Sequence, residues 1–310
     1  MKKNEFKIFS FYQFIKILKP LKLKNLLKDF CQFHKLKGTI LVAKEGINGT
    51  IGGTEQSIRD FEKKILQLGF KSLISKYSFN PYMPFYRLKI KYKNEIITFT
   101  KKQLDIQNVR AKSIEPKDWN KIINNKDVYL IDVRNNYESE IGTFKKAIKS
   151  NTKNFTEFKN YIKNNLIDKK NKKIAMFCTG GIRCEKASSY MMSLGFKNLY
   201  QLKGGILDYL KDISKKESKW EGECFLFDNR VSVKNEMQKG SYSLCHGCRM
   251  PLLKKDKLSS KFENGVSCDK CFDQTSEIKK DRLRQRNRQI EIAKKKGLYN
   301  PFIRYTPSDY

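Results

Sequence analysis

Hydrophobic and polar positions in the first hundred residues follow two periods, one typical of strands and one typical of helices. Four segments have the short apolar or alternating pattern of β-strands: residues 6–13, 39–43, 50–52 and 85–93. Between them, residues 15–30 and 54–68 carry apolar side chains at helical spacing. The order strand, helix, strand, strand, helix, strand predicts a ferredoxin-like, acylphosphatase-like α+β domain over residues 1–103.

Single residues set local details of this domain. Pro20 should kink or split the first helix, because proline cannot continue the backbone hydrogen bonding of a helix. Thr54 is a candidate N-cap for the second helix. Residues 45–50 (EGINGT) contain an Asn-Gly pair, which favours a hairpin turn between the two central strands.

Residues 104–116 form a polar linker that ends at Pro116, and the residue before a proline disfavours helical backbone. The pattern changes after this linker. Three nearly unbroken apolar runs then occur: residues 127–133, 172–177 and 198–201. Helical segments at 155–165 and 185–194 separate them, and this alternation predicts a parallel sheet covered on both faces. Residues 117–215 are therefore expected to form an α/β domain, and the whole chain is assigned to the α/β class.

The remaining chain divides into a cysteine-bearing module at residues 216–275 and a basic tail at residues 276–310. No run of eighteen apolar residues occurs, and the first residues lack the apolar core and cleavage site of a secretory signal. We therefore expect no membrane span and a cytoplasmic protein. The sequence does not indicate an oligomeric state.

Charge and histidine content narrow the function classes. The formal net charge of +33 is typical of nucleic-acid binding, because Lys and Arg neutralise phosphates. However, the cations are 53 Lys and only 12 Arg. A genome that favours A-rich codons would produce the same excess of lysine. With only two histidines, His34 and His246, the chain nearly excludes a two-His iron centre, a three-His zinc site and most Ser-His-Asp sites.

One short loop carries the strongest sign of chemistry. Cys178 ends a predicted buried strand, and Thr179, Gly180, Gly181, Ile182 and Arg183 lead from it into a helix. The two glycines let successive amides form an anion-binding nest, and the helix N-terminus and Arg183 add positive charge. This environment favours the thiolate of Cys178, which is the nucleophilic form of cysteine.

This loop, CTGGIR, resembles the active-site loop of the rhodanese superfamily, in which the cysteine carries a persulfide. Two further segments agree with that resemblance: residues 131–144 (IDVRNNYESEIGTF) and residues 202–206 (LKGGI). With EGINGT, FCTGGIRCEKAS and WEGECFLFDNRV, nearly the whole chain resembles the rhodanese-like tRNA uridine hydroxylases. That family joins an acylphosphatase-like domain to a rhodanese domain.

The resemblance implies an oxygen-dependent conversion of the wobble uridine of tRNA to 5-hydroxyuridine, with Cys178 as the catalytic cysteine. Its partners would be tRNA, bound at the anticodon region, and molecular oxygen as co-substrate. The residues show no glycine fingerprint for a flavin or nicotinamide. The alternative is a rhodanese-type sulfurtransferase or persulfide carrier that acts on thiosulfate or a protein thiol, with a sulfur donor as its partner.

Four residues are expected to support this loop. Cys184 is close enough to Cys178 to form a disulfide with it, although packing alone also explains a cysteine in a first helical turn. Asp132 and Arg134 are expected to pair and hold the strand ends. Glu138 is expected to orient Arg183.

Four cysteines in the C-terminal module have the spacing of a zinc ribbon: Cys245, Cys248, Cys268 and Cys271. A closed site of four thiolates has no open position for water, so its zinc would be structural. The tail holds four clustered arginines that could bind phosphates: Arg282, Arg284, Arg286 and Arg288. A solvated helix is the alternative for that tail.

Overall fold

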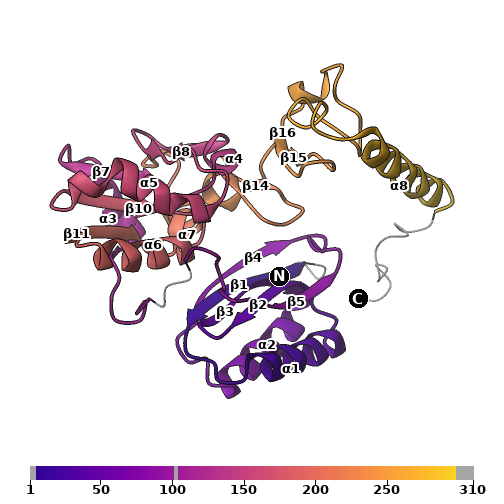
Figure 1. The fold of residues 1–310 in the computed structure, drawn as a ribbon. Helices are drawn as coiled ribbons and strands as arrows, with labels where there is room; N and C mark the ends of the chain where they lie inside the picture. The colour runs from indigo at the N-terminus through magenta and orange to yellow at the C-terminus, as the bar shows by residue number, and fades with distance from the viewer. Residues whose placement is uncertain (1–4, 101–103, 298–310) are drawn as a thin grey trace.

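The computed structural model describes residues 5–100 and 104–297, so the expected tail beyond residue 297 lies outside the described residues. The N-terminal unit is a five-stranded sheet with strand order β4-β1-β3-β2-β5 and two helices on one face (Figure 1). Its elements are β1 (Phe6–Phe14), α1 (Pro20–Phe33), β2 (Lys37–Ala43), β3 (Gly46–Gly53), α2 (Glu55–Gln67), β4 (Ile74–Asn80) and β5 (Leu88–Tyr92).

This topology confirms the expected acylphosphatase-like domain, but the start of its first helix and one edge strand differ from the expectation. Pro20 does not break a helix but starts α1, since its missing N–H costs nothing in the first turn. The edge strand β4 was not predicted, because its exposed side chains weaken the apolar alternation. Thr54 caps α2 as expected, accepting a 3.1 Å hydrogen bond from the amide of Ser57.

The Asn-Gly pair of EGINGT does not form the hairpin turn. Asn48 and Gly49 lie inside β3, where Asn48 is paired with Leu41 of β2 and Tyr12 of β1. The chain reverses earlier, and Gly46 begins β3 with φ +150°. A side chain at Gly46 would meet the carbonyl oxygen of Gln13 at 2.1 Å, so the close approach of β1 requires glycine there.

The central domain contains the expected parallel sheet, with strand order β6-β11-β10-β7-β9. Its strands are β6 (Lys112–Ile114), β7 (Val128–Asp132), β9 (Ile148–Lys149), β10 (Lys173–Phe177) and β11 (Asn198–Leu202). Its helices are α3 (Pro116–Ile123), α4 (Asn136–Ser139), α5 (Phe158–Asn165), α6 (Ile182–Ser193) and α7 (Gly205–Asp212). Separate hydrophobic clusters form on its two faces, one including residues of α5 and α6 and the other residues of α3 and α7.

The C-terminal part consists of short hairpins followed by one long helix, α8 (Glu277–Lys295). Two of these hairpins are β13 (Cys224–Phe225) with β14 (Ser232–Val233) and β15 (Ser243–Leu244) with β16 (Pro251–Leu252). The strand β12 (Trp220–Gly222) instead pairs with β8 (Gly142–Phe144) of the central domain. Trp220, Cys224 and Leu226 pack into the core on one face of the central parallel sheet. The start of the expected C-terminal module therefore packs with the central domain, and the four-cysteine segment extends beyond it (Figure 1).

Candidate functional site

The Cys178 loop is held at the carboxyl end of β10 by two glycine-dependent contacts. Gly181 has φ +102° and precedes the first residue of α6, so the loop turns directly into the helix N-terminus. Behind the loop, Gly205 has φ +69°, and a side chain there would meet the carbonyl oxygen of Cys178 at 2.4 Å. This close approach lets the amide of Ile206 donate a 2.9 Å hydrogen bond to that carbonyl. The LKGGI motif thus supports the loop from behind.

The expected nest is present around the sulfur of Cys178. The amide of Gly181 donates to Cys178 Sγ at 3.1 Å, and the side chain is completely buried. Burial acts to raise the pKa of the Cys178 thiol, but several interactions that lower this pKa together outweigh burial. A hydrogen bond from the Cys184 thiol, the charge of Arg183 and the amides of Cys184 and Gly181 lower this pKa to about 5. Cys178 is therefore a thiolate at neutral pH.

The other buried thiols outside the four-cysteine cluster have raised pKa values, in contrast to Cys178. Burial raises the pKa of Cys31 and of Cys224 to about 12. Burial and the adjacent Cys178 thiolate also raise the pKa of Cys184 well above its usual value. All of these cysteines are free thiols, so Cys184 acts here as a hydrogen-bond donor to Cys178 and not as a disulfide partner.

We expect Cys178 to be alkylated faster than Cys31, Cys184 and Cys224 when the folded protein meets iodoacetamide at pH 7. The thiolate is the reacting form, so the rate at Cys178 should stay constant down to about pH 6 and fall as the pH drops through about 5. Peptide mapping by mass spectrometry measures the rate at each cysteine. Faster labelling of Cys31 or Cys224 in the folded protein would contradict the proposed activation.

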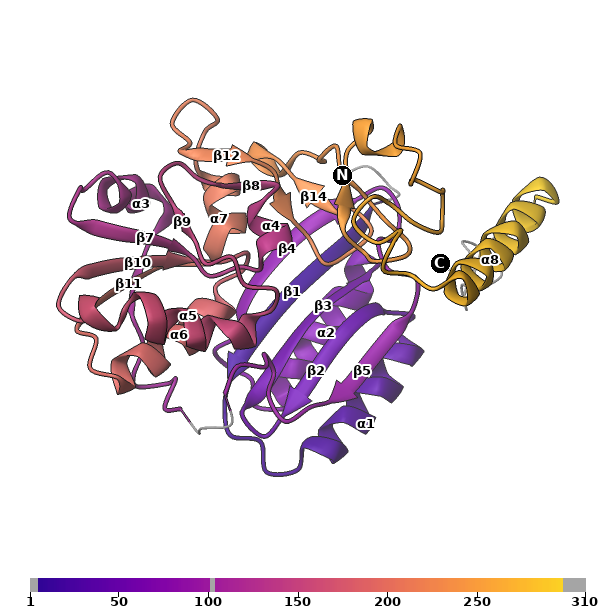
Figure 2. The ribbon, with the colours of Figure 1, turned by 45° about the horizontal axis from the view of Figure 1, so that its top comes forward.

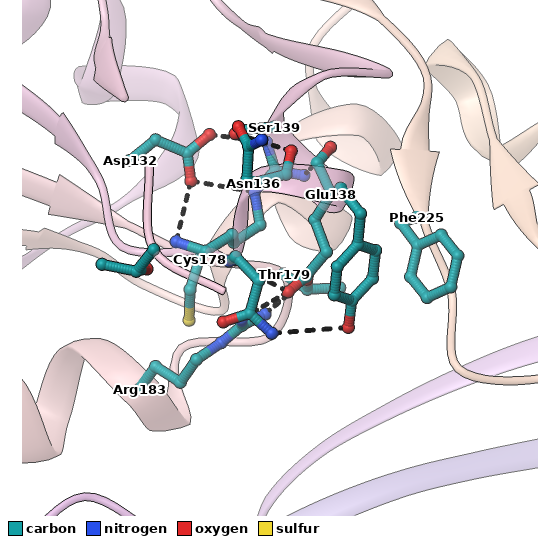
Figure 3. Close-up of polar contacts among 12 residues, drawn as sticks. Asp132, Asn136, Glu138, Ser139, Cys178, Thr179, Arg183 and Phe225 are labelled. Carbon is teal, nitrogen blue, oxygen red and sulfur yellow. Dashed lines mark hydrogen bonds and ion pairs between the residues drawn. The ribbon is translucent and has the colours of Figure 1, made fainter. Parts of the chain in front are cut away.

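A buried ion pair between Arg183 and Glu138 fixes the surroundings of the loop (Figure 3). Arg183 places its two terminal nitrogens 2.7 Å from the two carboxylate oxygens of Glu138, and both residues are buried. Thr179 donates to Glu138 through its hydroxyl at 3.3 Å. The expected contact between Glu138 and Arg183 is therefore present, and it ties α6 to α4.

The expected pair of Asp132 and Arg134 is also present and fully buried. Arg134 donates to Asp132 through Nε at 2.9 Å and through Nη2 at 2.6 Å. Its Nη2 also donates to the carbonyl of Gly142, and its guanidinium lies 5.1 Å from the ring centroid of Trp220. Neither Asp132 nor Arg134 is among the residues that line the cavity beside Cys178. They connect the end of β7 with β8 and β12.

The N-terminal domain supplies a second layer of contacts that the sequence did not predict. Tyr12 in β1 donates its hydroxyl to Glu185 of α6 at 3.1 Å. The buried ammonium of Lys186 lies 2.7 Å from carboxylate oxygens of both Glu45 and Glu95. Glu45 belongs to EGINGT and Lys186 to FCTGGIRCEKAS, so the two sequence motifs meet in this ion pair.

Lys76 in β4 makes a further contact between the domains. Its ammonium lies 2.6 Å from Asp208 of α7, beside Gly204 of the LKGGI motif. Burial lowers the pKa of Lys76, while the negative charges of Asp208 and Cys178 act in the opposite direction. Only the folded chain brings this lysine to the loop, because β4 and β10 are about a hundred residues apart.

A cavity of about 700 Å³ lies between the N-terminal sheet and the Cys178 loop. This volume lies within the usual range for small-molecule sites. From the loop, its lining includes Cys178, Thr179, Gly180, Ile182 and Arg183. The N-terminal sheet and the segment after β13 supply the opposite walls, with residues that include Tyr12, Thr50, Lys76, Phe227 and Arg230. The reactive thiolate therefore faces a space large enough for a nucleotide, with walls from three parts of the chain.

The four expected metal ligands form a compact cluster. Their sulfur atoms lie within 4.8 Å of one another, and Cys245 to Cys271 and Cys248 to Cys268 are separated by 3.8 Å and 3.7 Å. A tetrahedron with Zn–S bonds of about 2.3 Å has edges of about 3.8 Å. The spacing of these four sulfur atoms therefore fits a zinc ion bound by four thiolates.

The four arginines of the tail lie on α8, but they differ in their contacts. Arg284 binds both carboxylate oxygens of Glu263 at 2.8 Å, and this pair fastens α8 to the cysteine module. Arg282, Arg286 and Arg288 are exposed. Arg284 is thus engaged within the chain, whereas the exposed side chains of Arg282 and Arg288 are accessible to a partner.

Comparison with known proteins identifies both domains. Residues 6–96 match the family described as UPF0176 acylphosphatase like domain, and residues 115–212 match the rhodanese-like domain. A tRNA uridine(34) hydroxylase of Pelagibacter ubique is 48% identical over 294 residues, covering 94% of this chain and 96% of that protein. The tRNA uridine(34) hydroxylase of Teredinibacter turnerae is 44% identical over 295 residues, covering 95% and 92%.

Among solved structures, a rhodanese-like domain protein from Staphylococcus aureus is similar to part of the chain. It is 27% identical with a TM-score of 0.26, and the match covers 32% of this chain and 90% of that one. Within residues 5–100 and 104–297, no helix has the length and apolar character needed to cross a membrane.

Proposed function

This chain belongs to the tRNA uridine(34) hydroxylase family, and from that membership we propose that it hydroxylates the uridine at position 34 of tRNA. The product would be 5-hydroxyuridine in the anticodon, with molecular oxygen as co-substrate. The observation that supports this proposal most strongly is the Cys178 thiolate facing a cavity of nucleotide size. Since tRNA would be the substrate, we also place the protein in the cytoplasm.

Cys178 is proposed as the essential group of this reaction. Its thiolate is the strongest nucleophile in the cavity, and the buried Arg183–Glu138 pair keeps the loop in place around it. A base in an anticodon loop can leave its stack and enter such a cavity at modest free-energy cost. A sulfurtransferase, the alternative from the sequence, is not the activity named for either relative.

The four-cysteine cluster is proposed to hold a structural zinc ion, bound by Cys245, Cys248, Cys268 and Cys271. Four thiolate ligands leave no open position for substrate, so the ion would stabilise the module and not take part in the chemistry. The module has a small hydrophobic cluster composed mainly of these cysteines with Leu252 and Phe262. A metal would therefore supply much of its folding free energy.

The function is tested with purified protein and tRNA from a strain that lacks the gene. We expect 5-hydroxyuridine to form at position 34 in air and not under nitrogen, as read by mass spectrometry of the tRNA nucleosides. The same protein should transfer little sulfur from thiosulfate to cyanide. Efficient sulfur transfer without any 5-hydroxyuridine would instead support the sulfurtransferase.

A further inference from the structure

The N-terminal sheet has one face that the two helices of its own domain leave uncovered. Helices α1 and α2 pack on the other face, and Figure 2 looks onto the uncovered side. Ile40 and Ile90 pack against the helices, so their strand neighbours must point to the uncovered face. Pairing of β2 with β5 sets Lys89 beside Thr39 and Lys91 beside Leu41, and both neighbours line the Cys178 cavity.

Five cations gather along this side of the sheet: Arg87, Lys89, Lys91, Lys93 and Arg249. The first four are exposed residues in or next to β5, and Arg249 comes from the four-cysteine module. Partial burial, together with the positive charges of Arg87, Lys91 and Arg249, lowers the pKa of Lys89. Arg249 is therefore brought close enough to affect Lys89, although the two are far apart in sequence.

These cations are not balanced by acidic side chains. Within the described residues, none of the five forms an ion pair, whereas cations with structural roles such as Lys186 and Arg284 do. Like charges held together without counterions repel one another, and a polyanion relieves that repulsion. General lysine enrichment does not explain why the structure gathers Arg249 with the lysines of β5.

The row of cations leads to the reactive thiolate. Alternate residues of a strand are spaced roughly 6.6 Å apart on one face, so Lys89, Lys91 and Lys93 form a line of charges. Lys93 already lines the cavity that contains Cys178. Phe85 and Phe227 line the same cavity, and Phe227 is 67% exposed, so an aromatic surface for an unstacked base lies beside the charges.

We infer that this basic row, formed by Arg87, Lys89, Lys91, Lys93 and Arg249, binds the phosphates of the tRNA anticodon loop next to the uridine in the Cys178 cavity. The inference rests on the proposed function, which supplies tRNA as the partner. It assigns RNA binding to the uncovered sheet face and the cysteine module together. A single-stranded loop fits this row better than a duplex does, because its bases are free to stack and enter the cavity.

The test compares two sets of three charge removals on different faces of the protein. Lys89→Gln, Lys91→Gln and Arg249→Gln are combined in one variant. Lys22→Gln, Lys28→Gln and Lys63→Gln form the control, since these exposed lysines lie on α1 and α2, across the same sheet. Fluorescence anisotropy measures binding of an RNA hairpin with the anticodon stem and loop, over a range of salt concentrations.

We expect the basic-row variant to bind roughly a hundredfold more weakly at 0.1 M salt, with a log-log salt slope lower by roughly 2. The helix-face control should stay within a few-fold of the parent. The Lys89→Gln/Lys91→Gln double variant leaves the cysteine module intact. Its decrease in salt slope should be about two thirds of the decrease in the triple variant. The alkylation rate of Cys178 should be the same in all variants, which shows that the active-site loop is folded.

Equal affinity and salt slope in the parent and the basic-row variant would overturn the inference, as would an equal loss in the control. Failure of the parent to bind the hairpin at all would also overturn it. If RNA binding depends on the basic row but no hydroxylation is detected, the result supports this RNA-binding surface and contradicts the proposed reaction.

Discussion

Replacing Cys178 by serine is expected to abolish formation of 5-hydroxyuridine while leaving the protein folded. Serine has nearly the same size, but its hydroxyl does not ionise near neutral pH, so the nest at Gly181 would no longer surround an anion. Removal of an essential nucleophile typically costs ~10³-fold or more in kcat. Nucleoside mass spectrometry after incubation with tRNA measures the loss, and circular dichroism checks the fold.

Two substitutions of Cys184 distinguish its roles. Cys184→Ser retains a hydroxyl that can donate to the Cys178 thiolate, so most activity should remain. Cys184→Ala removes that donor, which should raise the pKa of Cys178 and shift the pH dependence of its alkylation upwards. If Cys184→Ser loses as much activity as Cys178→Ser, a disulfide cycle between the two residues is part of the reaction.

The thiolate loop could be predicted from sequence because its parts are contiguous. The strand end, the turn at Gly181 and the N-terminus of α6 follow one another within a few residues, so local rules place their amides around one atom. The cysteine cluster could be predicted for a similar reason, since C-x-x-C spacing brings two ligands together before any tertiary contact forms.

The opposite wall of the site could not be predicted in this way. Tyr12, Lys76 and Glu45 reach the loop only because the N-terminal sheet docks on α6 and α7. EGINGT illustrates the limit, because its Asn-Gly pair suggested a turn from local propensity. Pairing of β3 with both β1 and β2 outweighs that propensity, and Asn48 instead donates to the carbonyl of Ile96 at 3.0 Å.

Replacing Glu138 by alanine is expected to cause the largest loss of stability among single changes near the site. Glu138 is fully buried and accepts two 2.7 Å hydrogen bonds from Arg183, which is itself buried. Removing one partner of a buried pair leaves an uncompensated charge and typically costs about 3–5 kcal/mol. Urea denaturation, followed by tryptophan fluorescence, measures the change in the free energy of unfolding.

The matched control is Glu140→Ala, because Glu140 forms a 2.8 Å ion pair with Lys270 but is 42% exposed. Exposed pairs contribute about 0–1 kcal/mol, so this variant should have nearly the same free energy of unfolding as the parent. Burial acts to raise the pKa of Glu138, but the charge of Arg183 and its hydrogen bonds outweigh burial and hold that pKa below the ordinary value of a glutamate. The pair therefore stabilises the parent fully above the ordinary glutamate value of 4.5, and less as the pH falls through the lowered pKa of Glu138. The difference in free energy of unfolding between the parent and Glu138→Ala should shrink in acid. A constant difference from pH 7 to pH 3 would show that lost packing, not the ion pair, causes the destabilisation.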